Sequence, residues 1–134
     1  MEDIKKLKLL IVDDDRDLLR QLEFLLEDDF KEVLTASSKE QALESVSAHG
    51  DVDVFLVDVR LSETDPGNRE GLELVKEIRR QNSNAVILMM SRYTAAKYEE
   101  LVRQEAQADG FIRKPFTMDE FIELAAGIKR EEQC

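Results

Sequence analysis

Acidic, hydroxyl and amino side chains stand directly after four short apolar runs of this sequence. These side chains are Asp13, Asp14, Asp58, Ser91 and Lys114. Three carboxylates brought close together repel one another, and burying them without partners would be costly. A hard divalent cation with oxygen ligands relieves that conflict. Mg²⁺ suits the set best, because it uses few carboxylates, keeps water molecules and completes its shell with phosphate oxygens.

The same residue types could carry out phosphoryl transfer to a carboxylate. Asp58 can act as a nucleophile that holds the phosphoryl group covalently. The ammonium group of Lys114 supplies a point charge for one phosphoryl oxygen, and the Ser91 hydroxyl can donate to another. Because the transition state is loose, catalysis is mostly positioning and stabilisation by cations.

Each residue also has an ordinary structural interpretation. A single aspartate after a strand usually caps a turn or a helix, and Asp15 and Asp17 fit the start of a helix, where acids favour the helix dipole. Taken singly, Ser91 would be a turn residue and Lys114 a solvated one. The combination is far more specific, because each residue falls at the carboxyl end of a predicted strand.

The elements that position these residues alternate strictly along the chain. Short runs that are apolar on both faces suit buried parallel strands. We predict strands at 8–12, 32–36, 52–57, 85–90 and 111–113, and helices at 16–27, 38–49, around 72–78, at 95–108 and from 117 or 118 to about 128. Ser38 with Gln41 predicts a capping box at the second helix.

Five strand–helix units predict an α/β fold of the flavodoxin-like, doubly wound (βα)5 type. It has a five-stranded parallel sheet with helices on both faces. We expect a single domain over residues 1–134 with its core at about 8–129. In open sheets of this kind, the site lies outside the carboxyl ends of the strands.

Composition narrows the class of protein. The chain has 43% hydrophobic and 37% charged residues, which is typical of a soluble globular protein. Its net charge of −11 argues against nucleic-acid binding by this domain. The single Cys134 excludes an intramolecular disulfide and fits a reducing compartment. No run of 18 apolar residues exists, and residues 1–8 lack an apolar signal region, so we expect a cytoplasmic protein without membrane contact.

Four segments resemble the signatures of response-regulator receiver domains, and the resemblance covers residues 8–129. The segments are Ile11-Val12-Asp13-Asp14, Leu56-Val57-Asp58, Met90-Ser91 and Lys114-Pro115-Phe116. The resemblance implies that Asp58 accepts a phosphoryl group from a histidine kinase or a histidine phosphotransfer protein. It implies that Asp13, Asp14, Asp58 and the backbone carbonyl of Arg60 bind Mg²⁺.

The resemblance also implies a conformational switch. Ser91 would follow the phosphoryl group, Lys114 would bind it, and the Lys114–Pro115 bond would be cis. Phe111 matches an aromatic switch position, with plain core packing as the alternative. The face formed by the fourth helix, fifth strand and fifth helix would shift, act on an effector domain or protein and could support a homodimer. Such a domain is a signalling phosphoacceptor, not an enzyme acting on other substrates.

The sequence departs from the family pattern around the expected pocket. Ser62 replaces the usual proline four residues after the phosphoacceptor, and the loop that follows, to residue 70, is longer than usual. Arg92 stands where the family has a small residue. Arg60 and Tyr93 occupy the two positions that tune dephosphorylation. We expect Arg60, Arg92 and Tyr93 to slow hydrolysis of the phosphoaspartate, unless both arginines simply point to solvent.

Three alternatives stay open from the sequence. Asp13-x-Asp15 with Ser91 and Lys114 also resembles haloacid-dehalogenase phosphatases, but these need an acidic motif at a later strand end, and Asp58 would have no role. A pseudo-receiver would share the fold and bind partners without phosphorylation. A flavin-binding flavodoxin-like domain lacks support, because no phosphate loop rich in Ser, Thr or Gly follows the first strand. The chain ends after the last helix, which suits both a single-domain regulator and a piece of a longer protein.

Overall fold

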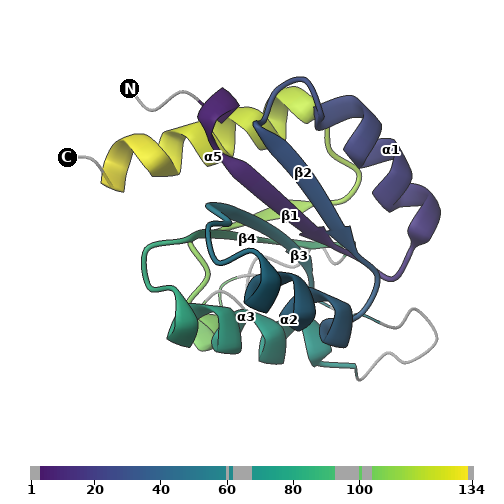
Figure 1. Cartoon of the computed structure of the whole chain (residues 1–134), viewed down its shortest axis with the longest axis vertical. Helices are drawn as coiled ribbons and strands as arrows, with labels where there is room; N and C mark the ends of the chain where they lie inside the picture. Colours follow the sequence, from purple (N-terminus) through teal and green to yellow (C-terminus); the bar gives the residue numbers. More distant parts are fainter. Residues whose placement is uncertain (1–3, 60, 62–67, 93–99, 101–103, 133–134) are drawn as a thin grey trace.

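A five-stranded parallel sheet forms the centre of the molecule (Figure 1). The structure, a computed structural model, describes residues 4–59, 61, 68–92, 100 and 104–132. The strands are β1 (Lys8–Val12), β2 (Glu32–Ala36), β3 (Val54–Asp58), β4 (Val86–Ser91) and β5 (Gly110–Arg113). They lie in the order β2-β1-β3-β4-β5, which is that of the flavodoxin-like doubly wound fold and confirms the predicted class.

Helices cover both faces of this sheet. α1 (Arg16–Leu26) and α5 (Met118–Glu132) lie on one face, and α2 (Lys39–Ala48) and α3 (Glu70–Gln81) lie on the other (Figure 1). A short 3-10 helix at Ile4–Lys6 precedes β1. Of the predicted helix at 95–108, residues 100 and 104–106 are helical, and 95–99 and 101–103 lie outside the described residues. No described helix is both long enough and apolar enough to span a lipid bilayer.

The two faces of the sheet carry separate apolar clusters, which explains the continuous apolar runs in the sequence. In β1, Leu10 and Val12 pack on the α2 and α3 side, whereas Leu9 and Ile11 pack on the α1 and α5 side. All four side chains are fully buried. Because both faces are covered, the alternation of apolar and polar residues seen in half-exposed strands is absent.

Several element boundaries differ from the prediction by one or two residues. β3 begins at Val54 instead of Val52, although Val52 is buried. Asp58 is the last residue of β3, where it pairs with Met90, instead of the first residue after it. Ser91 likewise ends β4. Apolar character reports burial, whereas a strand is defined by its hydrogen bonds, so the two limits need not coincide.

The first turns of α1 and α2 are capped by side chains. Asp15 caps α1, since its Oδ1 accepts hydrogen bonds from the backbone N–H groups of Asp17 and Leu18, each at 3.1 Å. Ser38 caps α2 by accepting from the Gln41 N–H at 3.1 Å. The predicted reciprocal bond is shifted by one residue, because Gln41 Oε1 accepts from the backbone N–H of Ser37 at 2.8 Å.

Candidate functional site

The carboxyl edge of the sheet gathers the residues that the sequence singles out. β1 pairs with β3, β3 with β4 and β4 with β5, all in parallel. Asp13 therefore emerges from β1 next to Asp58 at the end of β3, and Ser91 at the end of β4 lies between Asp58 and the end of β5. The backbone N–H of Lys114 donates to the Ser91 carbonyl at 2.8 Å, which extends the ladder to the lysine.

One ammonium group joins two of the carboxylates. Lys114 Nζ lies 2.6 Å from Asp13 Oδ2 and 2.6 Å from Asp58 Oδ2. The side chains of Lys114, Asp13 and Asp58 are 9%, 0% and 13% exposed. The lysine is therefore not a solvated surface residue. Its ammonium group pairs with two buried acids. Burying these carboxylates without a positively charged partner would be strongly unfavourable.

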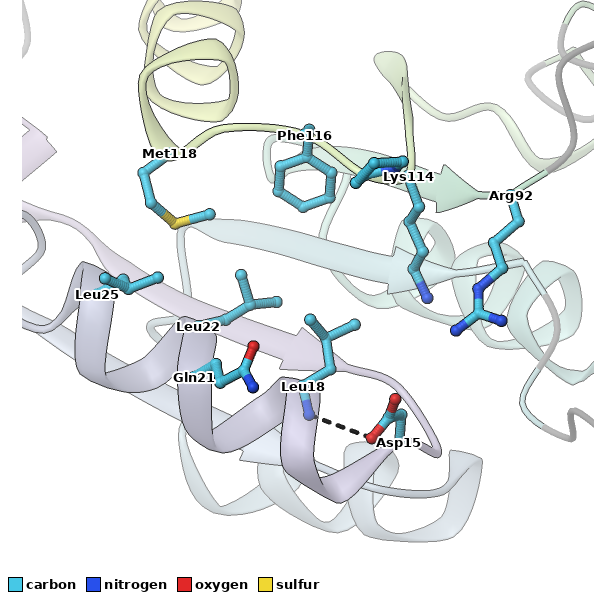
Figure 2. A pocket seen from close by; sticks show the side chains of 10 residues that line it. Asp15, Leu18, Gln21, Leu22, Leu25, Arg92, Lys114, Phe116 and Met118 are labelled. Atoms are coloured by element: carbon cyan, nitrogen blue, oxygen red, sulfur yellow. Dashed lines mark hydrogen bonds between the residues drawn. The ribbon is translucent and has the colours of Figure 1, made fainter.

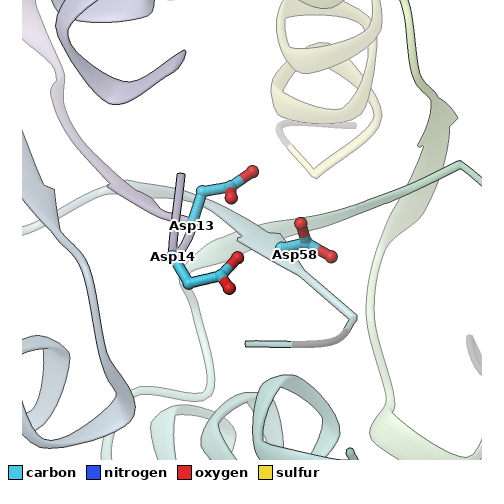
Figure 3. A group of neighbouring side chains, drawn as sticks. All are labelled: Asp13, Asp14 and Asp58. Carbon is cyan, nitrogen blue, oxygen red and sulfur yellow. The ribbon is translucent and has the colours of Figure 1, made fainter. Parts of the chain in front are cut away.

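A third carboxylate completes an acidic cluster. Asp13, Asp14 and Asp58 each offer an oxygen, and these oxygens lie within 4.8 Å of one another (Figure 3). Asp13 Oδ1 also accepts from the Asp15 backbone N–H at 2.9 Å, which orients its carboxylate. Hard oxygen donors at this spacing suit a divalent cation such as Mg²⁺ or Ca²⁺. Three carboxylate oxygens this close together form a donor set that fits a metal ion.

Burial and neighbouring charges shift the pKa values of Asp13 and Lys114. Burial raises the pKa of Asp13, and the neighbouring charge of Asp58 raises it further, against the opposing influence of Lys114. For Lys114, burial lowers the pKa, but the charges of Asp58 and Asp13 outweigh burial and leave it raised overall. The lysine therefore stays charged at neutral pH, and the ionised form of Asp13 is the one that the site disfavours.

Most of the other residues expected at the site lie in the part of the chain that the structure describes. Ser91 is buried, with 4% of its surface exposed, and the Lys114–Pro115 bond is cis. Phe111 is half-buried and packs against the apolar cluster on the α2 and α3 side, as both of its interpretations allow. Arg92 is exposed. Arg60 and Tyr93 lie outside the described residues.

An apolar pocket lies next to the acidic cluster. The sequence did not predict this pocket. It has a volume of about 490 Å³ and lies between α1 and the segment that joins β5 to α5 (Figure 2). Lys114 and Arg92 lie at one end of it, and their cationic groups approach the same region (Figure 2). Its apolar lining includes Leu18, Leu22, Leu25, Phe116 and Met118. The three leucines lie on α1, within the helix predicted at 16–27.

Comparison with known proteins links this site to one family. A sequence model described as the response regulator receiver domain matches residues 9–126. The nisin biosynthesis regulatory protein NisR of Lactococcus lactis is 33% identical over 94% of this chain and 52% of its own length. The transcriptional regulatory protein CpxR of Escherichia coli is 30% identical over 92% of this chain and 49% of its own length. The chain thus spans about half the length of the curated relatives it matches.

Solved structures agree with the sequence comparison. A response regulator receiver domain protein from Clostridium thermocellum superposes with a TM-score of 0.79 at 25% identity, covering 95% of this chain and 97% of that one. The chemotaxis protein CheY4 of Vibrio cholerae superposes with a TM-score of 0.78 at 26% identity, covering 92% and 98%. These matches do not favour the phosphatase alternative.

The raised pKa of Asp13 predicts that Asp13→Asn stabilises the folded chain at pH 7. Because the folded state binds this proton more readily than the unfolded state, stability falls as the pH rises from the ordinary pKa of 3.8 through the higher folded value. The gain from Asp13→Asn should therefore be full above that interval and absent below it. We expect a gain on the order of 1 kcal/mol, the usual size for a substitution that relieves a conflict of charges.

Urea unfolding in metal-free buffer at pH 7 and near pH 3.5 measures this difference. Asp17→Asn is the matched control, because that carboxylate is 81% exposed and pairs with Arg20 on the surface of α1. It should change the free energy of unfolding by less than about 0.5 kcal/mol. An Asp13→Asn variant that is no more stable than the parent at pH 7 would contradict the assignment of repulsion to this cluster.

Proposed function

Because the chain belongs to the response-regulator receiver-domain family, we propose that Asp58 accepts a phosphoryl group from the phosphohistidine of a histidine kinase or a histidine phosphotransfer protein. The observation that carries this proposal is the Lys114 ammonium group, 2.6 Å from the carboxylates of both Asp13 and Asp58. A cation held beside a buried nucleophile can stabilise the negative charge of the phosphoryl group as it is transferred. As a receiver domain, the chain is a signalling module.

We propose that Mg²⁺ is the metal of this site. Asp13, Asp14 and Asp58 would supply carboxylate oxygens, and by family resemblance the backbone carbonyl of Arg60 would add one more. When bound, the ion would neutralise charge on the phosphoryl oxygens. The close grouping of the three acids supports this proposal, and the need for phosphate oxygens to complete the shell favours Mg²⁺.

The side chains of the chain itself would then divide the work. A carboxylate oxygen of Asp58 would form a bond to phosphorus while the bond from phosphorus to the donor's histidine nitrogen breaks. Lys114, already beside Asp58, would exchange its carboxylate contacts for a phosphoryl oxygen. Asp13 would remain charged, because a metal ion favours the ionised carboxylate. The Ser91 hydroxyl would donate to a further phosphoryl oxygen.

Phosphorylation would be transmitted through β4 and β5. Movement of Ser91 toward the phosphoryl group would shift Phe111 and the face built from the fourth helix, β5 and α5. The available energy is the difference in contacts between the two states. That face is the proposed surface for an effector domain or protein and for a homodimer. Amide chemical shifts along β4 and β5, before and after phosphorylation, would report the movement.

The wider setting of the chain is also proposed. Residues 1–134 would form one receiver domain with its core at 8–129, working in the cytoplasm, where histidine kinases present their phosphohistidines. A net charge of −11 would keep this domain from binding nucleic acid by itself. The matched relatives NisR and CpxR are regulatory proteins about twice as long, so the output of the whole protein would depend on what accompanies this domain.

We predict that the chain gains one acid-stable, base-labile phosphoryl group when incubated with acetyl phosphate and Mg²⁺. Asp58→Asn should abolish the gain, because an amide cannot form the acyl phosphate. Intact-protein mass spectrometry measures the label. Asp53→Asn is the matched control, since Asp53 precedes the same strand and accepts from the Lys8 N–H at the opposite edge of the sheet. Unlabelled parent protein, as a pseudo-receiver would give, or a labelled Asp58→Asn variant, would refute the assignment.

The position of Arg92 predicts a long-lived phosphoaspartate. Arg92 lines the pocket next to Lys114, where a guanidinium can contact a phosphoryl oxygen and hinder an attacking water. Arg92→Ala should speed decay by about threefold to tenfold, equivalent to roughly 0.6–1.4 kcal/mol. Arg60→Asn should add to this effect, and Tyr93 would contribute bulk at the same approach.

Loss of label after removal of the donor, in excess Mg²⁺, measures the decay. Arg20→Ala serves as the control, because that side chain is 76% exposed on α1 and pairs with Asp17. If decay is equally fast in the parent protein, Arg92→Ala and Arg20→Ala, then Arg92 does not shield the phosphoryl group.

A further inference from the structure

The first turn of α3 lies directly against the chain that leaves β3. Gly71, the second residue of this helix, is buried there. A Cβ atom at this position would lie 1.9 Å from the Asp58 carbonyl oxygen and 2.5 Å from the Val59 carbonyl oxygen. Even weak carbon–oxygen contacts keep about 3.3 Å. Both oxygens belong to the backbone, so no side-chain rotation can relieve the overlap.

Asn68 holds the same segment from its other end. Its Oδ1 accepts hydrogen bonds from the backbone N–H of Leu61 at 2.9 Å and from that of Glu70 at 3.1 Å. Its Nδ2 donates to Glu70 Oε1 at 2.8 Å. One side chain thus ties the chain beyond β3 to the start of α3. Leu61, 7% exposed, is also anchored in the apolar cluster on that side of the sheet.

We infer that Asn68 and Gly71 form a positioning clamp for the phosphoacceptor, resting on the proposed function of Asp58. Gly71 sets how closely α3 approaches the Asp58 and Val59 carbonyls, and Asn68 holds Leu61 to the same helix end. Together they hold Val59 and Leu61, which follow Asp58 in the chain. The clamp thereby fixes where the Asp58 carboxylate stands relative to Asp13 and Asp14.

The geometry of the acidic cluster makes this position matter. The oxygens of Asp13, Asp14 and Asp58 share a region only 4.8 Å across. Mg²⁺ demands near-ideal octahedral geometry with bonds of about 2.0–2.1 Å. Relieving the overlap at Gly71 would take a backbone displacement of about 1 Å or more, and a misplacement of about 1 Å can lower a rate roughly a hundredfold. A methyl group at residue 71 should therefore weaken Mg²⁺ binding and slow phosphorylation of Asp58.

Two other glycines provide matched controls. A Cβ at Gly110 would lie 2.9 Å from Leu88 Cδ2 and 3.3 Å from Ile128 Cδ1, which are side-chain ends in the core between β5 and α5. Nothing lies within 4 Å of a Cβ at Gly127 on α5. Gly110→Ala therefore tests crowding of the core away from the acids, and Gly127→Ala tests the substitution itself.

Three measurements on the full chain test the clamp. They are urea unfolding, the Mg²⁺ midpoint from amide chemical shifts, and the initial rate of labelling by acetyl phosphate at saturating Mg²⁺. Gly71→Ala should raise the Mg²⁺ midpoint and lower the saturated rate by at least about tenfold. Gly110→Ala should lose stability while keeping both values, and Gly127→Ala should keep both values and be at least as stable as the parent protein, because alanine is the better helix former. A folded Gly71→Ala variant with the parent's midpoint and rate overturns the inference.

Asn68 keeps the inference testable if Gly71→Ala does not fold. Asn68→Ala introduces no overlap, and it should raise the Mg²⁺ midpoint and lower the rate by about threefold or more, the equivalent of one lost hydrogen bond. Asn68→Asp retains the acceptor oxygen but places a second carboxylate beside Glu70, so it should recover only part of both values. Asn82→Ala is the control at the far end of α3, where Asn82 accepts from the Asn84 N–H at 3.2 Å.

The outcomes separate the clamp from the proposed function. Parental midpoint and rate in Asn68→Ala overturn the clamp, as does an equal effect of Asn82→Ala. If the parent protein takes no label at Asp58, the proposed function fails, and the Mg²⁺ midpoints of the variants still decide whether the clamp positions the cluster.

Discussion

The contact of one ammonium group with two buried carboxylates is the interaction on which the site depends. Lys114 lies between Asp13 and Asp58, and no other described cation forms an ion pair with either acid among the salt bridges of the structure. Three acids in a region this small would otherwise repel one another or take up protons. The lysine offsets part of that repulsion, and the three carboxylates together form a group that could hold a metal ion. The repulsion among the carboxylates disfavours folding, and the same concentration of charge suits the site to a metal ion and, through it, to phosphate.

The fold makes this arrangement possible by burying both faces of a parallel sheet. Each strand delivers its last residue to the same edge, so residues 13, 58, 91 and 114 converge although they are far apart in sequence. The helices then brace the edge from both sides. Asp15, the N-cap of α1, immediately follows the acidic pair, and the first turn of α3 lies against the backbone of Asp58. These contacts between helix starts and strand ends position the site.

Residue types and order were enough to predict the fold and the location of the site. Continuous apolar runs report strands buried on both faces, and alternation with helices then requires a parallel sheet. The same logic placed Asp58 and Ser91 at the carboxyl edge. It did not predict the strand limits where a residue is buried but lies outside the hydrogen-bonded strand, as at Val52. It also did not predict that the backbone partner of Gln41 is Ser37 instead of Ser38.

Contacts that depend on tertiary distance had no signal in the sequence. Nothing in the order of residues shows that Lys114 contacts two acids at once, or that Gly71 meets the Asp58 carbonyl. Arg79 is a further case: from the end of α3 it donates to Asp109 Oδ2 at 2.9 Å and to the Gln107 carbonyl at 3.0 Å. A glycine in a helix can mark a close packing contact, and arginine is an ordinary helix residue, but neither residue type identifies the partner.

The stability of Lys114→Met with and without Mg²⁺ tests the central role of the lysine most directly. Methionine keeps the bulk of the side chain and removes its charge, so Asp13 and Asp58 both lose their ion pair with Lys114. At pH 7 without metal, urea unfolding should show a loss on the order of 3 kcal/mol, and Mg²⁺ should restore more stability to this variant than it adds to the parent protein. Lys39→Met, which removes a more exposed pair with Glu73, should show neither effect. A Lys114→Met variant as stable as the parent without metal, or one that gains nothing extra from Mg²⁺, would contradict the account.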